Sequence, residues 1–384
     1  MNRTKQELLS PPIGVSAVLF LILLSGIPRF GFSLLWLVIN ALGIACLYLG
    51  TKISHMNFKK VTKASLLLGI LVVFLTIFAS FRGLSGIPWA IVIATLWTLV
   101  LGLSAISSKI FNYNGFPIHS ILIYVIGALF IVHSFSRYGS WHAIRALPLT
   151  PPEGALGMFL LFISFPSIFE YLLSSGNRTL SSLFIALSLG LMLLHGFRAD
   201  AALILLSSFI IVYKRGSRSS YILLAIFLVL FLFVDLIRAD INVPLMDRIA
   251  YRLGTTYYYS MELLNWSLSL PLARDPLWLF SVPLHPSQTI GRGIFGKEYG
   301  ITPTIFVEFS LLYGILGIVL LSSLIGILSG YSYRLFKENR DHSSYPIIWS
   351  ILITRAEIGL SQLDFALIAG SVVFAILANL INGK

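Results

Sequence analysis

The sequence predicts an all-α, polytopic integral membrane protein that forms a single transmembrane domain over residues 1–384. Composition is the first reason, because 57% of the residues are hydrophobic and 11% are charged, whereas soluble proteins carry about 25% charged residues. The mean hydropathy of +0.90 agrees with this class. The second reason is arrangement: long apolar runs recur along the chain and are separated by short polar connections. One long polar stretch, residues 238–303, interrupts the series.

About twelve apolar segments have the length that a helix needs to cross roughly 30 Å of hydrocarbon. The sequence shows no second domain and no internal repeat. The expected spans are Ile13 to Gly26, Phe30 to Gly50, Ala64 to Phe81, Gly86 to Ile106, Ile118 to Phe135, Gly154 to Leu173, Leu180 to Phe197, Asp200 to Tyr213, Tyr221 to Leu236, Thr304 to Tyr331, Tyr345 to Leu360 and Asp364 to Ile381.

The positive-inside rule predicts that both termini lie in the cytoplasm. We expect a multi-pass protein of the cytoplasmic (inner) cell membrane. No small-residue cleavage site follows the first apolar run, so we expect that run to remain as a spanning helix. Residues 238–303 then form a long extracytoplasmic loop between the ninth and tenth helices, which carries short interfacial helices. The basic residues expected on the cytoplasmic side are Arg3, Lys5, Lys52, Lys59, Lys60, Lys63, Lys109, Arg178, Lys214, Arg215, Arg218, Arg334, Lys337, Arg340 and Lys384.

The basic residues on the expected outer side are nearly all arginines, since only Lys297 of the ten lysines lies there. Arginine and lysine serve equally well as topology signals, so orientation does not account for this difference. A guanidinium group binds phosphate oxygens in pairs and keeps its charge when it is desolvated. We therefore expect an outward-facing anion site, with arginines that snorkel at helix ends as the alternative. The net charge of +12 does not indicate nucleic-acid binding, because the basic residues form no stripe or tail.

Three arginines on expected outer helical segments are candidates to hold this anion. Arg198 lies at the outer start of the eighth helix, where the positive helix end leaves it in need of a counter-ion, either Asp200 or a ligand phosphate. Arg248 and Arg252 are four residues apart, so they would share one face of a helix in the outer interface. There they would act either as ligands or as anchoring cations.

Two further candidates, Arg292 and Lys297, lie in a glycine-rich segment just before the tenth helix. Glycine lets the backbone approach a ligand closely, and a helix N-terminus adds the positive end of a dipole. Neither a strand nor a P-loop lysine accompanies this segment, so it does not indicate a nucleotide-binding loop. Asp200, Glu298 and Arg355 are expected to support the site.

Two residues are candidates to take a proton from an attacking hydroxyl. His285 lies in the long loop and can titrate near neutral pH, although a lone loop histidine is often incidental. Glu308 lies about one turn inside the tenth helix, for which Thr302 is the expected N-cap and Pro303 the first residue. A carboxylate is costly there unless it faces a polar cavity, so we expect Glu308 to act as a base or to pair with an arginine.

Charged residues also interrupt the last helical hairpin. Arg355 and Glu357, with Asp364 nearby, are most simply interpreted as pairing with one another. Metal ligation is not expected, since the sequence has no His-x-x-x-His, no cysteine pair and no Asp-x-Asp.

The chain resembles O-antigen polymerases and ligases, the Wzy/WaaL-type group, in its layout of about twelve helices with one long outer loop before the tenth. Residues 195–206, His-Gly-Phe-Arg-Ala-Asp-Ala-Ala-Leu-Ile-Leu-Leu, are similar to the Gly-x-Arg segment that opens a helix in this family. Residues 301–309, Ile-Thr-Pro-Thr-Ile-Phe-Val-Glu-Phe, and then Tyr313-Gly-Ile-Leu-Gly-Ile are similar to the segment that leaves the long loop in oligosaccharide repeat-unit polymerases. The ligase branch has a His-Asn pair where this chain has Pro303-Thr304, which favours the polymerase branch.

The resemblance implies polymerisation of oligosaccharide units, linked to undecaprenyl or dolichyl diphosphate, on the outer face of the membrane. Arg198 and an arginine of the long loop, Arg252 or Arg292, would hold the diphosphate. We expect an inverting glycosyl transfer without metal, nucleotide sugar or other cofactor. The expected partners are a polyprenyl-diphosphate-linked donor and acceptor, membrane lipids, a chain-length regulator and a flippase, with no nucleic acid.

Other functions stay open. A lipid-linked oligosaccharide flippase also has about twelve helices, but transporters often have repeated halves with polar sites near the midplane, and no halves are detectable here. An O-antigen-ligase-like glycan transferase is a second alternative. A polyprenyl-phosphate-sugar glycosyltransferase typically has acidic residues in its first outer loop, whereas that loop, Ile27 to Phe32, contains Arg29 and no carboxylate.

Overall fold

The computed structural model describes residues 7, 9–56, 62–71, 118–139, 152–194, 198–217, 219, 222–223, 226, 245–267, 303–339, 343–360 and 362–381. Every regular element in these ranges is helical, which confirms the predicted all-α class. The main helices are α2 (Pro11–Phe30), α3 (Leu34–Ser54), α6 (Ile118–Tyr138), α8 (Pro152–Ser174), α9 (Arg178–Leu194), α10 (Arg198–Lys214), α12 (Leu245–Ser267), α14 (Ile305–Lys337), α15 (Ser344–Ile358) and α16 (Gln362–Ile381).

Within the described ranges, five helices are long and apolar enough to cross a membrane. The helices α9, α10 and α15 match further expected spans but are shorter, at 17, 17 and 15 residues. The expected span Gly86 to Ile106 lies outside the described residues, as do most of Ala64 to Phe81 and Tyr221 to Leu236. The total of about twelve spans thus stays a prediction. The five candidate spans are Pro11–Phe30, Leu34–Ser54, Ser120–Tyr138, Leu156–Ser174 and Tyr313–Lys337.

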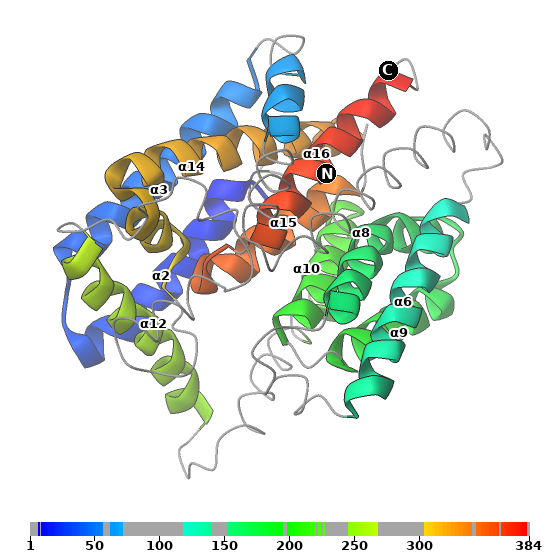
Figure 1. The fold of residues 1–384 in the computed structure, drawn as a ribbon, viewed down its shortest axis with the longest axis horizontal. Coiled ribbons are helices and arrows are strands. Elements are labelled where there is room, and N and C mark those ends of the chain that lie inside the picture. The colour runs from blue at the N-terminus through cyan, green and yellow to red at the C-terminus, as the bar shows by residue number, and fades with distance from the viewer. Residues whose placement is uncertain are drawn as a thin grey trace.

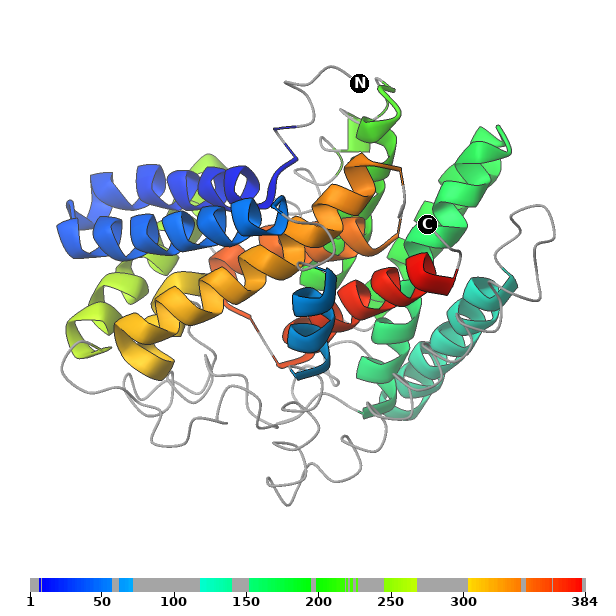
Figure 2. The same cartoon turned by 90° about the horizontal axis from the view of Figure 1, so that it is seen from above.

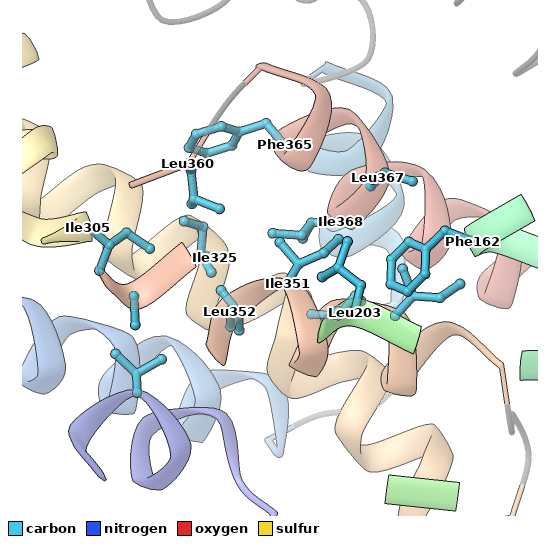
Figure 3. Packing of buried hydrophobic residues seen from close by; sticks show 14 of the residues in the cluster. Phe162, Leu203, Ile305, Ile325, Ile351, Leu352, Leu360, Phe365, Leu367 and Ile368 are labelled. Atoms are coloured by element: carbon cyan, nitrogen blue, oxygen red, sulfur yellow. The ribbon is translucent and has the colours of Figure 1, made fainter. Parts of the chain in front are cut away.

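The helices form two groups joined by α15 and α16 (Figures 1 and 2). One group contains α2, α3, α12 and α14, and the other contains α6, α8, α9 and α10. Figure 3 shows the apolar core where they meet, with Phe162 of α8 and Leu203 of α10 beside side chains of α15 and α16. The helix α15 is buried between both groups, and most of its circumference is apolar, as this position requires.

Glycines bring α3 and α14 into close backbone contact. A Cβ atom on Gly326 would lie 2.5 Å from the carbonyl oxygen of Leu47, and one on Gly50 would overlap the carbonyl oxygen of Ser323. Helices in a membrane gain stability from such close approach, since apolar association alone gives little there. Glycine at these positions therefore lets α3 and α14 run side by side (Figure 2).

The start of α14 differs from the sequence-based prediction. Its N-cap is Thr304 and its first residue is Ile305, so the expected N-cap at Thr302 was wrong. Thr304 has an extended backbone (φ −63°, ψ 154°), and buried polar groups of α3 and α12 hold it in this conformation. The helix therefore begins after Thr304 and leaves Pro303 outside.

A break divides α14 into a short first part and the candidate span Tyr313–Lys337. Gly314 has φ +64° and ψ −152°, a conformation open essentially to glycine alone. A Cβ atom there would meet no other atom within 4 Å, so conformation rather than crowding requires the glycine.

The helix α12, which lies in the predicted outer loop, docks on the turn between α2 and α3. The buried Tyr257 hydroxyl accepts the N–H of Ser33 at 2.9 Å and donates to the carbonyl of Gly31 at 3.0 Å. Gly26 leaves room for the Tyr257 ring, because a Cβ atom at that position would overlap the ring. These contacts place α12 and the α2–α3 turn on the same side of the molecule, as the predicted topology requires.

Candidate functional site

The candidate site is built around Glu308, which lies in the first turn of α14 with 1% of its surface exposed. Its N–H donates to the carbonyl of the N-cap residue Thr304 at 2.9 Å. This observation confirms that Glu308 lies about one turn inside the helix. The side chain points into the protein rather than into water or lipid. The chemistry open to its carboxyl group therefore depends on the neighbouring protein groups.

Three hydrogen bonds fix the start of α14 inside the helical bundle. The Thr304 N–H donates to Ser260 Oγ of α12 at 3.0 Å, and Thr304 Oγ1 donates to Asn40 Oδ1 of α3 at 3.0 Å. Asn40 is itself held by its Nδ2, which donates to the carbonyl of Trp36 at 2.8 Å. All three polar side chains are buried, so the position of the helix start is set by satisfied polar groups.

The start of α14 is recessed relative to the start of α3. Asn40 lies six residues after Leu34, the first residue of α3. At a rise of 1.5 Å per residue, this separation places Thr304 about 9 Å along α3 from its first residue. Glu308 therefore lies below the end of the α2–α3 hairpin and not at the rim of the molecule.

The two carboxyl oxygens of Glu308 have different surroundings. Oε2 accepts the N–H of Leu360, in the turn between α15 and α16, at 2.7 Å. Oε1 is buried and has no hydrogen-bond partner among the residues that the structure describes. A buried carboxyl oxygen without a partner is costly. Oε1 is therefore suited to receive a hydroxyl group from a bound molecule or from water.

Gly359 makes the contact between Glu308 and the α15–α16 turn possible. Its φ of +76° is a conformation that residues with side chains rarely adopt. A Cβ atom on Gly359 would also overlap Oε2 of Glu308. The turn thus requires glycine both for its backbone conformation and for the approach of the carboxyl group.

An ion pair closes the same turn from the other side. Arg355 Nε, at the end of α15, lies 2.9 Å from Asp364 Oδ2 in the first turn of α16. Asp364 is 1% exposed and the neighbouring Glu357 is 7% exposed. The expected pairing within this hairpin is confirmed for Arg355 and Asp364, whose charges offset each other beside the turn that Glu308 contacts.

Comparison with known families covers most of the chain, including the residues of this turn. The family model described as “Putative O-antigen polymerase” matches residues 7–368, which include Glu308, Arg355 and Asp364. The chain belongs to this family. No curated protein and no solved structure matches it. Membership places the protein in polysaccharide biosynthesis and confirms the resemblance found in the sequence.

The structure places several predicted site residues of this O-antigen polymerase family member only by their backbone. Arg198 and Asp200 lie in the first turn of α10, while Arg248 and Arg252 lie one turn apart on α12. The side chains of these four residues lie outside what the structure describes. His285, Arg292, Lys297 and Glu298 lie wholly outside the described residues.

Of the predicted site residues, the described part of the structure brings Glu308 and Arg355 to one turn. Sequence reasoning did not identify the groups that connect them, which are Gly359 and the Leu360 N–H. The signal available in the sequence was the Gly359-Leu360 pair between two apolar helices, where a glycine can end the first helix. Ser260 and Asn40 carried no signal, because single polar residues in apolar helices are common.

Proposed function

We propose that this chain is a polysaccharide polymerase, which joins lipid-diphosphate-linked oligosaccharide units on the outer face of the membrane. Its family membership over residues 7–368 supports this function. The structural observation that supports the mechanism is the buried carboxyl group of Glu308. Its Oε2 accepts the Leu360 N–H, and its Oε1 has no hydrogen-bond partner within the described part of the chain. The proposal includes about twelve spans in one domain, cytoplasmic termini and an outer loop at residues 238–303.

In the proposed reaction, a hydroxyl oxygen of the acceptor sugar attacks the anomeric carbon of the donor unit. The bond from that carbon to the lipid diphosphate breaks, and the diphosphate leaves with the electron pair. The hydroxyl proton moves to Oε1 of Glu308, and attack opposite the leaving group inverts the anomeric centre. Because the leaving group is already negative, fixed guanidinium groups suffice to stabilise it.

The charges around Glu308 suit a neutral acceptor hydroxyl better than a diphosphate. Asp364 and Arg355 pair with each other, so together they add no net positive charge beside Glu308. We therefore assign the diphosphate to basic residues on other elements. These residues are Arg198 on α10, Arg248 and Arg252 on α12, and Arg292 and Lys297 in the loop, with Asp200, Glu298 and Arg355 in support.

His285 is the alternative proton acceptor, since an imidazole can take a proton near neutral pH. Glu308 is favoured because, among the described residues, nothing forms a hydrogen bond with its Oε1. Comparison of Glu308→Gln with His285→Ala separates the two: loss of the base lowers the rate by about 10²- to 10⁴-fold. If a variant keeps the wild-type rate, the residue that was replaced in it is not the base.

The experiment that tests the function gives purified protein a lipid-diphosphate oligosaccharide in the presence of a chelator, and product length is read on a gel. A ladder of products supports the polymerase, and a single added unit supports the ligase-like transferase. Glu308→Gln should abolish the ladder, whereas Glu338→Gln, at the far end of α14, should keep it. A wild-type protein that forms no product would overturn the proposal.

The break in α14 favours one alternative, a lipid-linked oligosaccharide flippase. Transporters often bind substrate at discontinuous helices, and Tyr313 and Gly314 interrupt α14 within the bundle. A vesicle assay decides between the two. Translocation of the lipid-linked unit without new glycosidic bonds would support the flippase, while bond formation without translocation supports the polymerase.

A further inference from the structure

The ends of α3 and α14 carry a second cluster of charged residues, at the other end of α14 from Glu308. This basic cluster consists of Lys52, His55, Arg334 and Lys337. Arg334 Nη1 donates to the carbonyl of Met56 at 3.2 Å, so the two helix ends are tied together. The rings of His55 and Tyr333 are perpendicular, with their centroids 6.2 Å apart.

Part of the positive charge of the basic cluster is not compensated within the described structure. Arg334 pairs with Glu338, with 2.9 Å between Nε and Oε1. Lys52 lies over the ring of Tyr48 at 5.4 Å, and no carboxylate among the described residues pairs with Lys52 or Lys337. The negative ends of the two helix dipoles offset about half a charge each, so roughly one positive charge remains.

The pKa of His55 is lowered, as expected for a partly buried group beside an excess of positive charge. Partial burial lowers the pKa of His55, and the charges of Arg334, Lys337 and Lys52 lower it further, against a smaller opposing effect of Glu338. Lys214 of α10 also lies at this end of α14, where its Nζ donates to the carbonyl of Phe336 at 2.5 Å. A hydrogen bond to a neutral carbonyl leaves the ammonium charged, so Lys214 adds to the positive charge beside Lys337.

The position of the basic cluster indicates what it binds. The candidate spans Leu34–Ser54 and Tyr313–Lys337 both end there, so Lys52, His55 and Lys337 lie at the level of the lipid headgroups. The predicted topology puts this end at the cytoplasmic leaflet, where anionic lipids are found. We propose that the basic cluster is a binding site for the phosphate of an anionic phospholipid, independent of the proposed polymerase reaction.

The test measures which lipid stays with the protein. Full-length protein is reconstituted in vesicles with equal amounts of phosphatidylglycerol and phosphatidylcholine, extracted in mild detergent, and its retained lipid is counted by native mass spectrometry. Wild-type protein should retain phosphatidylglycerol preferentially. Lys52→Ala with Lys337→Ala should lower this preference about fivefold for each lysine removed. Lys52→Arg with Lys337→Arg should keep it, because the charges remain.

Arg178→Ala is the matched control, since Arg178 is an exposed cation at the start of α9, away from the basic cluster. Equal retention of phosphatidylglycerol by the double alanine variant and the wild type would overturn the proposal. An equal loss in Arg178→Ala would overturn it too, as would displacement of the lipid by inorganic phosphate. If the double alanine variant does not fold, the single variants Lys52→Gln and Lys337→Gln give the same comparison.

Discussion

Glu308 Oε2 accepts the N–H of Leu360 at 2.7 Å, across 52 positions of the chain. A side chain from the first turn of α14 thus completes the turn between α15 and α16. The Arg355–Asp364 ion pair spans the same turn, so three helix ends meet at one buried carboxyl group. The predictions below test this arrangement, the docking of α12 and the titration of His55.

Gly359→Ala should destabilise the protein and reduce chain extension. The positive φ costs a residue with a side chain roughly 1–3 kcal/mol, and the new methyl group would also displace Glu308. Thermal unfolding in detergent and the polymerisation rate measure the two effects. Gly190→Ala is the control, because a Cβ atom there meets no atom within 4 Å and alanine favours the helix by about 0.5–1 kcal/mol. Equal stability and activity of both variants would contradict the close contact with Glu308.

Glu308→Ala should lower stability more than Glu308→Gln does. Glutamine keeps an oxygen that can accept the Leu360 N–H, whereas alanine leaves this buried donor unpaired at a cost of about 1–3 kcal/mol. Chemical unfolding measures the difference between the two variants. If they unfold at the same denaturant concentration, the hydrogen bond contributes nothing to the stability of the turn.

Asp364→Leu alone should be strongly destabilising, by about 3–5 kcal/mol, because it removes the carboxylate that pairs with the largely buried guanidinium of Arg355. Adding Arg355→Met should recover part of this loss. The same double-mutant cycle at Arg137 and Glu153, where the arginine side chain is 61% exposed, should give a coupling of only about 0.2–1 kcal/mol. Equal coupling in the two cycles would show that burial does not strengthen the Arg355 pair.

Tyr257→Phe should loosen the contact between α12 and the α2–α3 turn. The substitution removes only the hydroxyl and leaves the Ser33 N–H and the Gly31 carbonyl without this partner. Hydrogen–deuterium exchange at residues 31–33 should speed up, while exchange in α6 should not change. Tyr258→Phe is the matched control, because Tyr258 is exposed. Faster exchange in both variants would assign the effect to something other than these two bonds.

His55→Gln should make the stability of the protein less sensitive to acid. Burial, with the charges of Arg334, Lys337 and Lys52, lowers the pKa of His55 in the folded state. The unfolded state therefore binds the proton more readily, and stability falls as the pH drops through the unfolded value of about 6.5. Unfolding temperatures of wild type and variant, measured from about pH 7.5 to about pH 5.5, report the difference. Parallel curves would refute the predicted effect.

The sequence predicted the features that depend on residue type and local spacing. Hydropathy identified the helical membrane class, and Glu308 does lie in the first turn of the tenth expected helix. The helix that carries Arg248 and Arg252 is present as α12. Each of these features follows from residues within one segment, so no tertiary contact is needed to infer it.

The features that the sequence did not predict depend on contacts between distant segments. The N-cap of α14 is Thr304 rather than the predicted Thr302, because Thr304 forms hydrogen bonds with Ser260 and Asn40. These two residues lie 44 and 264 positions away in the chain. Glu308 was expected to act as a base or to pair with an arginine, and the sequence did not indicate that its carboxyl group accepts the backbone N–H of Leu360 in the glycine turn. A charge pattern cannot reveal such a donor, because every residue except proline carries one.

The depth at which α14 begins has a consequence for access to its acid. With its first residues about 9 Å along α3, the helix holds Glu308 among buried side chains rather than at the exposed start of α3. In the proposed reaction, a sugar hydroxyl that meets Oε1 would have to enter between the ends of α14, α15 and α16, so the reaction would require these helix ends to separate.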